Sequence, residues 1–250
     1  FAYYGPFDGH DVENLIHVLE NAKRMHQPVL LHMVTNKGKG YAFAEERPDT
    51  FHGVSKFDVA TGEGSAVSGE SFSNTFGEHI CKLAEENDQI CAITAAMQTG
   101  TALNEFGIRF PKRFFDVGIA EEHAVTMAAG LAAGGMKPYF AVYASFFQRS
   151  FDQMIHDVCM PKLNVTLLLD RAGLVGEDGA THHGVWDLAS MLPVPNMVIL
   201  APRDLNELRV MMRWTQENES PCAIRYGKHS VDMRETYPCR EFTPGKWELM

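Results

Sequence analysis

Apolar and polar positions follow two patterns that alternate along the chain. Short apolar runs, typical of strands buried in a parallel sheet, cover residues 28–34, 90–94, 116–120, 137–142, 163–169, 198–200 and 222–226. Between the runs, apolar residues recur every three or four positions, which predicts helices over 11–25, 71–83, 124–133, 147–158 and 205–216. Strands that alternate with helices of this length predict an α/β fold with a doubly wound parallel sheet.

A Gly- and Ser-rich stretch divides the chain. Residues 59–70 (VATGEGSAVSGE) have the composition of a linker. We therefore expect residues 1–58 to be the end of one α/β domain, residues 71–230 to be a second one, and residues 231–250 to lead toward a further domain. Phe1 falls in the middle of a predicted strand and the last residues begin another element, so we expect a piece of a longer polypeptide.

Two local expectations concern the first part of the chain. Gly5-Pro6 and Asp8-Gly9 punctuate a turn-rich entry, and Asp11 is a plausible N-cap for the first helix. The run 28–34 lacks polar alternation, so we expect a strand buried on both faces.

Charge and apolar content exclude two classes of partner. The formal net charge is −10 and no long block of Lys or Arg occurs, so we do not expect nucleic-acid binding. No apolar run reaches the length of a membrane span, so we expect no membrane partner. A small anionic substrate remains compatible with this composition, because a few local arginines can override the global charge.

The cysteines indicate a reducing compartment. They are odd in number, scattered along the chain and without a CxxC pair, so we interpret them as reduced core thiols of a cytoplasmic protein. They are Cys81, Cys91, Cys159, Cys222 and Cys239.

Residues 116–124 (DVGIAEEHA) bring a carboxylate to the start of a helix built from small apolar residues. We expect Glu121 to be poorly solvated there, so that it can hold or share a proton near neutral pH. A first-turn glutamate stabilised by the helix dipole is the structural alternative.

A basic turn and a histidine follow the first predicted strands. Residues 37–40 (KGKG) leave the carboxyl end of the strand at 28–34, where α/β folds bind ligands. A solvated basic turn is the alternative. His52 lies in a loop too long for a simple connection, which suggests a functional loop. We interpret His10 as a loop or capping residue.

Side chains with useful chemistry collect where the strands of residues 71–230 end. In a parallel α/β sheet the ligand binds beyond the carboxyl ends of the strands. The residues placed there supply a carboxylate, aromatic rings, arginines and a histidine, which suit acid–base chemistry, stacking and anion binding. They are Met97, Glu121, Tyr143, Phe146, Arg171, Asp178, His182 and Arg225.

The Gly-rich loop 170–184 (DRAGLVGEDGATHHG) is the most informative segment. Arg171 can fork onto a phosphate or carboxylate, with a salt bridge to a neighbouring acidic residue as the alternative. Asp178 and His182 are four positions apart and could orient each other for proton transfer. His183 we interpret as a residue that shapes the loop. No third ligand stands at metal spacing, so we expect no metal ligand in this chain.

Four motifs occur together: GPFDGHD at 5–11, KGKGYAFAE…FHGVSKFD at 37–58, FDVGIAEEHAV at 115–125 and DRAGLVGEDGATHHG at 170–184. With them the chain resembles the 1-deoxy-D-xylulose-5-phosphate synthase family, thiamine-diphosphate enzymes related to transketolase. The similarity runs from about Tyr3 to Tyr226. Loop 170–184 is the most specific motif, because transketolases and pyruvate dehydrogenase β subunits share the glutamate motif but not this loop.

The resemblance implies roles in cofactor binding. It makes residues 1–58 the end of the diphosphate-binding domain and residues 71–230 the pyrimidine-binding domain. Glu121 corresponds to the glutamate that hydrogen-bonds N1′ of the cofactor's aminopyrimidine, and Phe146 to the ring that stacks on it. The further residues implied to contact the cofactor are Tyr41, Met97 and Ile119.

It also implies roles toward the substrates. His52 would help to move protons. Asp178 and His182 would contact the bound intermediate and the acceptor. The residues implied to hold the phosphate of the aldehyde are Tyr143, Arg171 and Arg225.

The implied reaction joins pyruvate to glyceraldehyde 3-phosphate with loss of CO₂. The product is 1-deoxy-D-xylulose 5-phosphate, a precursor of isoprenoids, thiamine and pyridoxal. Mg²⁺ would accompany the thiamine diphosphate, with its ligands outside this chain, so we expect the chain to be inactive alone. The resemblance further implies a homodimer of the complete protein.

Two other hypotheses stay open. The chain could use the same cofactor as a transketolase-like or pyruvate dehydrogenase β-like protein, although loop 170–184 argues against this. It could also be a noncatalytic domain that serves as a subunit or interaction module. Glu122, Ala95 and Lys228 depart from the family pattern, which has Gln, Pro and Arg there, and the last departure leaves the role of the segment around Arg225 open.

Overall fold

The computed structural model divides into two compact units, Phe1–Ser68 and Gly69–Met250. It describes residues 1–48, 50–54, 56–64, 70–228, 243 and 245. The division falls within residues 59–70, the stretch whose composition predicts a linker. Apart from residues 243 and 245, the expected C-terminal linker 231–250 lies outside the described residues.

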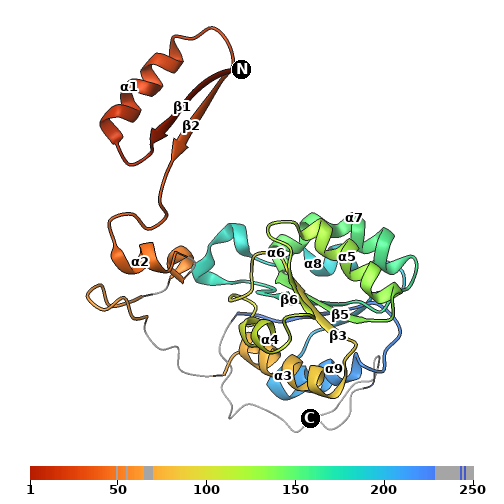
Figure 1. Ribbon diagram of the computed structural model, residues 1–250. Helices are drawn as coiled ribbons and strands as arrows, with labels where there is room; N and C mark the ends of the chain where they lie inside the picture. Colours follow the sequence, from red (N-terminus) through yellow and green to blue (C-terminus); the bar gives the residue numbers. More distant parts are fainter. Residues whose placement is uncertain (49, 55, 65–69, 229–242, 244, 246–250) are drawn as a thin grey trace. The chain divides into compact units, whose positions relative to one another are not determined.

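The first unit has a two-stranded parallel sheet with a helix alongside (Figure 1). Its elements are β1 (Ala2–Asp8), α1 (Val12–Lys23), β2 (Val29–Val34), α2 (Ala42–Glu46) and the 3₁₀ helix η1 (Thr50–Gly53). Asp11 caps α1 as predicted, since its side chain accepts a hydrogen bond from the Asn14 N–H. The loop predicted around His52 contains two short helices, α2 and η1.

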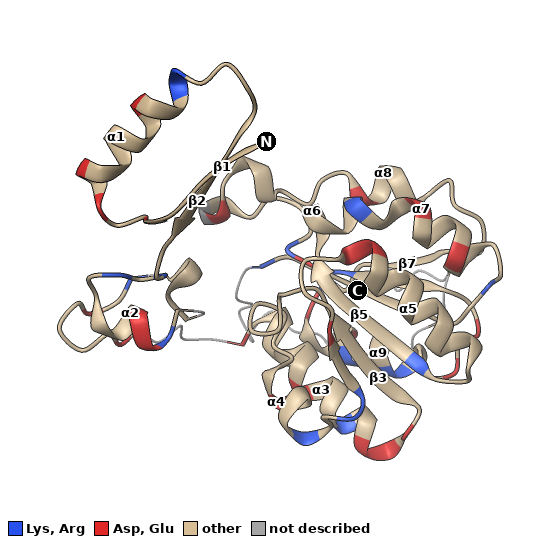
Figure 2. Cartoon of the chain, turned by 45° about the horizontal axis from the view of Figure 1, so that its top comes forward, with Lys and Arg blue, Asp and Glu red and all other residues tan. Residues whose placement is uncertain are grey.

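Two expectations for this unit are wrong. Gly5-Pro6 lies inside β1 rather than in a turn, and the strand continues past it with a register shift because proline has no N–H to donate. β2 is not buried on both faces, since Leu30 and Val34 are 55% and 51% exposed. Within the described residues of this unit, α1 lies along the strands in both views (Figures 1 and 2). The apolar side chains of β2 stay exposed where no described element covers them.

The second unit is a six-stranded sheet in which every neighbouring pair is parallel, as predicted. The strand order is β4-β3-β5-β6-β8-β7. The strands are β3 (Ile90–Thr94), β4 (Phe114–Asp116), β5 (Lys137–Tyr143), β6 (Thr166–Asp170), β7 (Val198–Leu200) and β8 (Cys222–Arg225).

Helices cover both faces of this sheet, so the fold is doubly wound (Figure 1). One core contains Phe76, Ile80 and Leu208, from α3 (Phe72–Glu86) and α9 (Leu205–Trp214), and α4 (Asn104–Arg109) lies on the same side. The other core contains Val125, Phe147 and Met191. The elements that cover it are α5 (Glu121–Ala133), α6 (Ala144–Phe147), the 3₁₀ helix η2 (Gln148–Ser150), α7 (Phe151–Gln153), the π-helix η3 (Met154–Cys159) and α8 (Asp187–Met191).

Three element boundaries differ from the prediction in ways that affect the site. β4 ends at Asp116, before the predicted strand 116–120, because Gly118 has a φ of +70° that a strand cannot continue through. The helix predicted at 147–158 begins at Ala144, so Phe146 lies in its first turn. The short helix α8 was not predicted.

Four of the five cysteines are buried free cysteines, which confirms that these four belong to the core. Burial raises the pKa of the Cys91 and Cys222 thiols to about 12. Cys239 lies outside the described residues. Among the described helices, none is both long and apolar enough to cross a membrane.

Candidate active site

Glu121 is a buried carboxylate at the first position of α5. It is 1% exposed, and its Oε2 lies 3.2 Å from Nη1 of Arg149. The contact has the distance of an ion pair but not the geometry of a hydrogen bond, and Oε2 accepts no hydrogen bond from the described residues. Buried acceptors without a donor are uncommon in folded proteins. Glu121 therefore offers an unused acceptor in a protected position.

The loops that follow β3 and β4 are tied together by Asp116. Its Oδ1 accepts the N–H groups of Ala96, at 2.8 Å, and Gly118, at 3.0 Å. These bonds place Met97 and Ile119, both predicted to contact the cofactor. Met97 is partly buried and its sulfur accepts the Tyr143 N–H at 3.5 Å, whereas Ile119 is 75% exposed.

Three predicted site residues form an aromatic cluster. The rings of Tyr143, at the end of β5, and Phe146, in α6, stack with centroids 5.8 Å apart. The His182 ring meets Phe146 edge-on at 5.4 Å. The structure thus brings together side chains from β5, α6 and loop 170–184, as the sequence predicts.

Arg171 is fixed on several sides. Its backbone φ is +59°, and its guanidinium carbon lies 3.7 Å from the centre of the Tyr143 ring. Nε donates to Asp178 Oδ2 at 3.1 Å, and Nη1 donates to the Gly100 carbonyl at 3.0 Å. The predicted structural alternative for Arg171 is also present, since Nη1 lies 3.4 Å from Asp170 Oδ1.

Asp178 does not orient His182, contrary to expectation. Its two carboxylate oxygens pair with Arg171 and with the Lys228 ammonium, and His182 Nδ1 instead lies 3.0 Å from the Thr181 hydroxyl. Partial burial opposes ionisation of Asp178, but the hydrogen bonds and charges of Lys228 and Arg171 outweigh it and lower its pKa. Asp178 is therefore an anionic partner for two cations.

Lys228 and Arg149 are site residues that sequence reasoning missed. Lys228 reaches Asp178 from the segment after β8, and Arg149 reaches Glu121 from η2. Both have a weak signal in the sequence, because each stands three positions after a predicted site residue, Arg225 and Phe146. His183 shapes its loop as expected, since its Nδ1 accepts the Val175 N–H at 3.1 Å.

Arg225 is engaged by a carboxylate that the prediction did not include. Its Nε and Nη2 donate to the two oxygens of Asp187 at 2.6 and 3.3 Å. Asp187 is 2% exposed and opens the unpredicted helix α8. An anion bound by Arg225 would share the guanidinium with the Asp187 carboxylate.

The first unit carries the remaining predicted residues. Tyr41 donates to the Val59 carbonyl at 3.0 Å. Its ring packs in an aromatic cluster with Phe43, Phe51 and Phe57. His52 Nδ1 lies within hydrogen-bond distance of the Lys37 ammonium.

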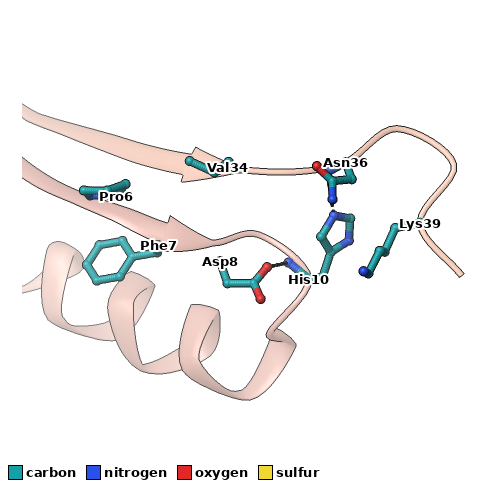
Figure 3. Close-up of a pocket in the computed structure, with 7 residues that line it drawn as sticks. All are labelled: Pro6, Phe7, Asp8, His10, Val34, Asn36 and Lys39. Atoms are coloured by element: carbon teal, nitrogen blue, oxygen red, sulfur yellow. Dashed lines mark hydrogen bonds between the residues drawn. The ribbon is translucent and has the colours of Figure 1, made fainter. Parts of the chain in front are cut away.

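His10 acts as a loop residue, as predicted, since its Nε2 accepts the Asn36 N–H at 2.7 Å. Its own N–H donates to Asp8 at 2.9 Å. Figure 3 shows His10 between Asn36 and Lys39 in a pocket at the carboxyl ends of β1 and β2. Among the described residues of the chain, no three His, Cys, Asp or Glu side chains come together as a metal site.

Two families match the sequence. Residues 69–233 match the transketolase pyrimidine-binding domain, and residues 1–35 match 1-deoxy-D-xylulose-5-phosphate synthase. The curated relatives include 1-deoxy-D-xylulose-5-phosphate synthases of Clostridium acetobutylicum and Caldanaerobacter subterraneus, each 51% identical to the chain. These alignments cover 99% and 100% of the chain but 40% of each relative, so the chain spans well under half the length of the curated relatives it matches.

Solved transketolases share the fold. A split-gene transketolase, described as an inactive β4 tetramer, matches with a TM-score of 0.63 and 33% identity over 72% of this chain and 58% of its own. A Pichia stipitis transketolase complex matches with a TM-score of 0.58 and 18% identity over 64% of this chain and 26% of its own. The second likeness is one of fold alone.

Proposed function

The chain belongs to the transketolase pyrimidine-binding domain family, and on that premise we propose that its second unit binds the aminopyrimidine of thiamine diphosphate. The observation that carries the proposal is the buried Glu121 Oε2, which has no hydrogen-bond donor among the described residues. A protonated ring nitrogen of the pyrimidine would donate a hydrogen bond to this acceptor. The residues present therefore fit the group.

Thiamine diphosphate supplies a thiazolium electron sink for decarboxylation and carbon–carbon bond formation when it is bound. Glu121, which is 1% exposed, would share the proton of the ring nitrogen in a position protected from water. Phe146, partly buried and stacked on Tyr143, would provide a flat apolar surface for the pyrimidine ring. Tyr41 and His52 of the first unit are proposed to serve the same reaction. We place the Mg²⁺ ligands outside this chain.

The proposed reaction is the decarboxylative condensation of pyruvate with glyceraldehyde 3-phosphate to 1-deoxy-D-xylulose 5-phosphate and CO₂. The names of the relatives support it. So does the chemistry of Arg171 and Lys228, two cations that share Asp178 and suit a phosphate. Arg225 is proposed to assist them. The proposal includes a homodimer and a cytoplasmic location, and the buried free cysteines support the location.

The test uses the complete gene product that contains this chain. Supplied with thiamine diphosphate, Mg²⁺, pyruvate and glyceraldehyde 3-phosphate, it should release CO₂ and form 1-deoxy-D-xylulose 5-phosphate, followed by ¹³C NMR. No such product, together with turnover of ketose donors, would select the transketolase-like alternative. Light scattering of the same sample should give a dimer mass.

We further propose that the 250-residue chain is inactive by itself. The related split-gene chain, described as inactive as a β4 tetramer, is consistent with this. Addition of both substrates and the cofactor to the isolated chain should give no product. A complete gene product that also turns over neither substrate pair would favour the noncatalytic alternative.

A further inference from the structure

We propose that Asp170 is a positioning residue that holds the Arg171 guanidinium where it receives the phosphate of the substrate, a role that rests on the proposed function. Asp170 is the last residue of β6 and is 0% exposed. Its Oδ2 accepts the Ser73 hydroxyl at 2.6 Å, and its Oδ1 lies 3.4 Å from Arg171 Nη1. One carboxylate thus connects α3 to the guanidinium.

The carboxylate and carbonyl partners of Arg171 occupy two of the three guanidinium nitrogens. Nε is used by Asp178, and Nη1 is shared between Asp170 and the Gly100 carbonyl. Nη2 donates to neither of the two carboxylates nor to the Gly100 carbonyl, and the Tyr143 hydroxyl is a further described partner of the guanidinium. A guanidinium held at two nitrogens loses little entropy when the third meets an anion.

The position of Asp170 carries a stability penalty. Burial raises its pKa to about 6, against the hydrogen bond from Ser73 and the charge of Arg171, which act in the opposite direction. The ionised form is therefore disfavoured in the folded chain, and an asparagine would fill the same space without that penalty. A costly charge in contact with a ligand-binding arginine is better explained by function than by packing.

Several groups face Asp170 from the elements packed against it. From β8 and the segment after it come the buried Tyr226 hydroxyl, which has no hydrogen-bond partner among the described residues, and the Lys228 ammonium. Tyr143 faces it from β5, and Asp178 lies on the other side of the shared Arg171 guanidinium. None of these replaces Asp170 as a partner of Nη1, so protonation of Asp170 should loosen the arginine.

The principal variant is Asp170→Asn in the complete gene product. We expect the KM for glyceraldehyde 3-phosphate at pH 8 to rise about tenfold, the loss of one charged hydrogen bond. The kcat and the KM for pyruvate should change by less than about twofold, because the change is confined to phosphate binding. In the wild type this KM should also rise as the pH falls through about 6. The rise should be smaller in the variant, where only the substrate phosphate, with a second pKa of about 6, gains a proton.

Two further variants separate positioning from general damage. Ser73→Ala removes a hydrogen bond that lowers the pKa of Asp170, so it should move the acidic rise in KM to higher pH. Asp157→Asn is the matched control, because Asp157 also accepts a hydroxyl hydrogen bond, from Thr126 at 2.6 Å, and should leave the KM unchanged. If Asp170→Asn does not fold, the pH profile of Ser73→Ala tests the inference instead, and an unshifted rise in KM would overturn it.

Binding of inorganic phosphate, measured by calorimetry, tests the inference without catalysis. Weaker phosphate binding by Asp170→Asn supports the role of Asp170 even if no 1-deoxy-D-xylulose 5-phosphate is formed. The inference on Asp170 can therefore be tested separately from the proposed function. If Asp170→Asn leaves both the Kd for phosphate and the KM for glyceraldehyde 3-phosphate unchanged, the inference is overturned. A lower kcat and lower thermal stability together with a higher KM for pyruvate would also overturn it, because they would indicate a structural role.

Discussion

Arg149 places Nη1 3.2 Å from Oε2 of Glu121, and the two side chains differ sharply in exposure, at 48% and 2%. The buried carboxylate therefore has one partner that can return to water at little cost. Because Arg149 is nearly half exposed, its contact with Glu121 is a weak source of stability. Glu121 can exchange this partner for a ligand donor without stranding a buried cation.

Replacement of Glu121 by glutamine should remove activity without unfolding the protein. Glutamine keeps the shape of the side chain but cannot hold a proton, so we expect kcat of the complete gene product to fall about 100-fold or more. The midpoint of thermal unfolding should change by only a few degrees, because the lost ion pair is partly solvated. Turnover and calorimetry on the same preparation check both statements.

Glu122→Gln is the control for this variant. Glu122 stands beside Glu121 and lies 3.8 Å from Arg149 Nε, but its side chain is 44% exposed. We expect kcat within about twofold of the wild type, as for most exposed substitutions. Loss of activity in both variants, or in neither, would contradict the assignment of Glu121.

Much of the second unit could be predicted because its strands carry unmistakable local signals. The residues of β3, for example, are apolar except for one threonine and fully buried, and the predicted ends agree with the observed ones. Met97, Tyr143, Phe146 and Arg171 could be grouped because the carboxyl ends of parallel strands meet at one edge.

The remaining features depend on contacts that no local pattern encodes. The pairing of Asp178 with Lys228 joins residues 50 positions apart, and the fork of Asp187 on Arg225 spans 38. β4 ends at Asp116, before the φ of +70° at Gly118, and the Asp116 side chain then accepts the Gly118 N–H. The exposure of Leu30 and Val34 depends on which elements cover the sheet, which a strand's own sequence cannot specify.

A methyl group at Gly100 should disturb the predicted phosphate site. A Cβ there would collide with the Tyr143 hydroxyl, and the Gly100 carbonyl accepts a hydrogen bond from Arg171. We expect Gly100→Ala to raise the KM for glyceraldehyde 3-phosphate roughly tenfold or more, since a shift of about 1 Å at a site can have large effects. Steady-state kinetics of the complete gene product would measure this.

Gly107→Ala is the matched control for Gly100→Ala. A Cβ at Gly107 would meet the end of the flexible Gln98 side chain at 2.9 Å and the Phe114 ring at 3.2 Å, and neither is a predicted site residue. Gly107 lies within helix α4, where alanine is favoured. The KM should stay within about twofold of the wild type. Equal effects of the two substitutions would show that Tyr143 and Arg171 are not the cause.

Phe146→Leu should weaken cofactor binding. Leucine keeps the position apolar but removes the flat ring that stacks on Tyr143 at 5.8 Å. The loss of one aromatic contact, about 1 kcal/mol, should raise the Kd for thiamine diphosphate about fivefold. Phe110→Leu is the control, because that ring contacts Arg109 and Arg113 rather than any predicted site residue. Unchanged affinity in Phe146→Leu would remove Phe146 from the proposed site.

His79 should make the folded chain sensitive to acid. It is 8% exposed in α3, and burial, assisted by the charges of Arg213, Arg209 and Lys82, lowers its pKa from 6.5 to about 4. Between these pH values the unfolded chain binds more protons than the folded chain, so stability is present above pH 6.5 and is lost as the pH falls. The contribution of His79 to the free energy of unfolding should fall by about 2 kcal/mol between pH 7.5 and pH 5.

His79→Gln isolates this contribution, because Asp170 titrates with the opposite sign. The raised pKa of Asp170, about 6, makes the folded chain bind its proton first, so acidification favours folding at that residue. Urea unfolding at both pH values should therefore show the wild type losing about 2 kcal/mol relative to His79→Gln. His156→Gln, at an exposed position, should lose as much free energy of unfolding as the wild type between the two pH values. If the gap between wild type and His79→Gln is the same at pH 7.5 and pH 5, His79 is not held neutral by its burial.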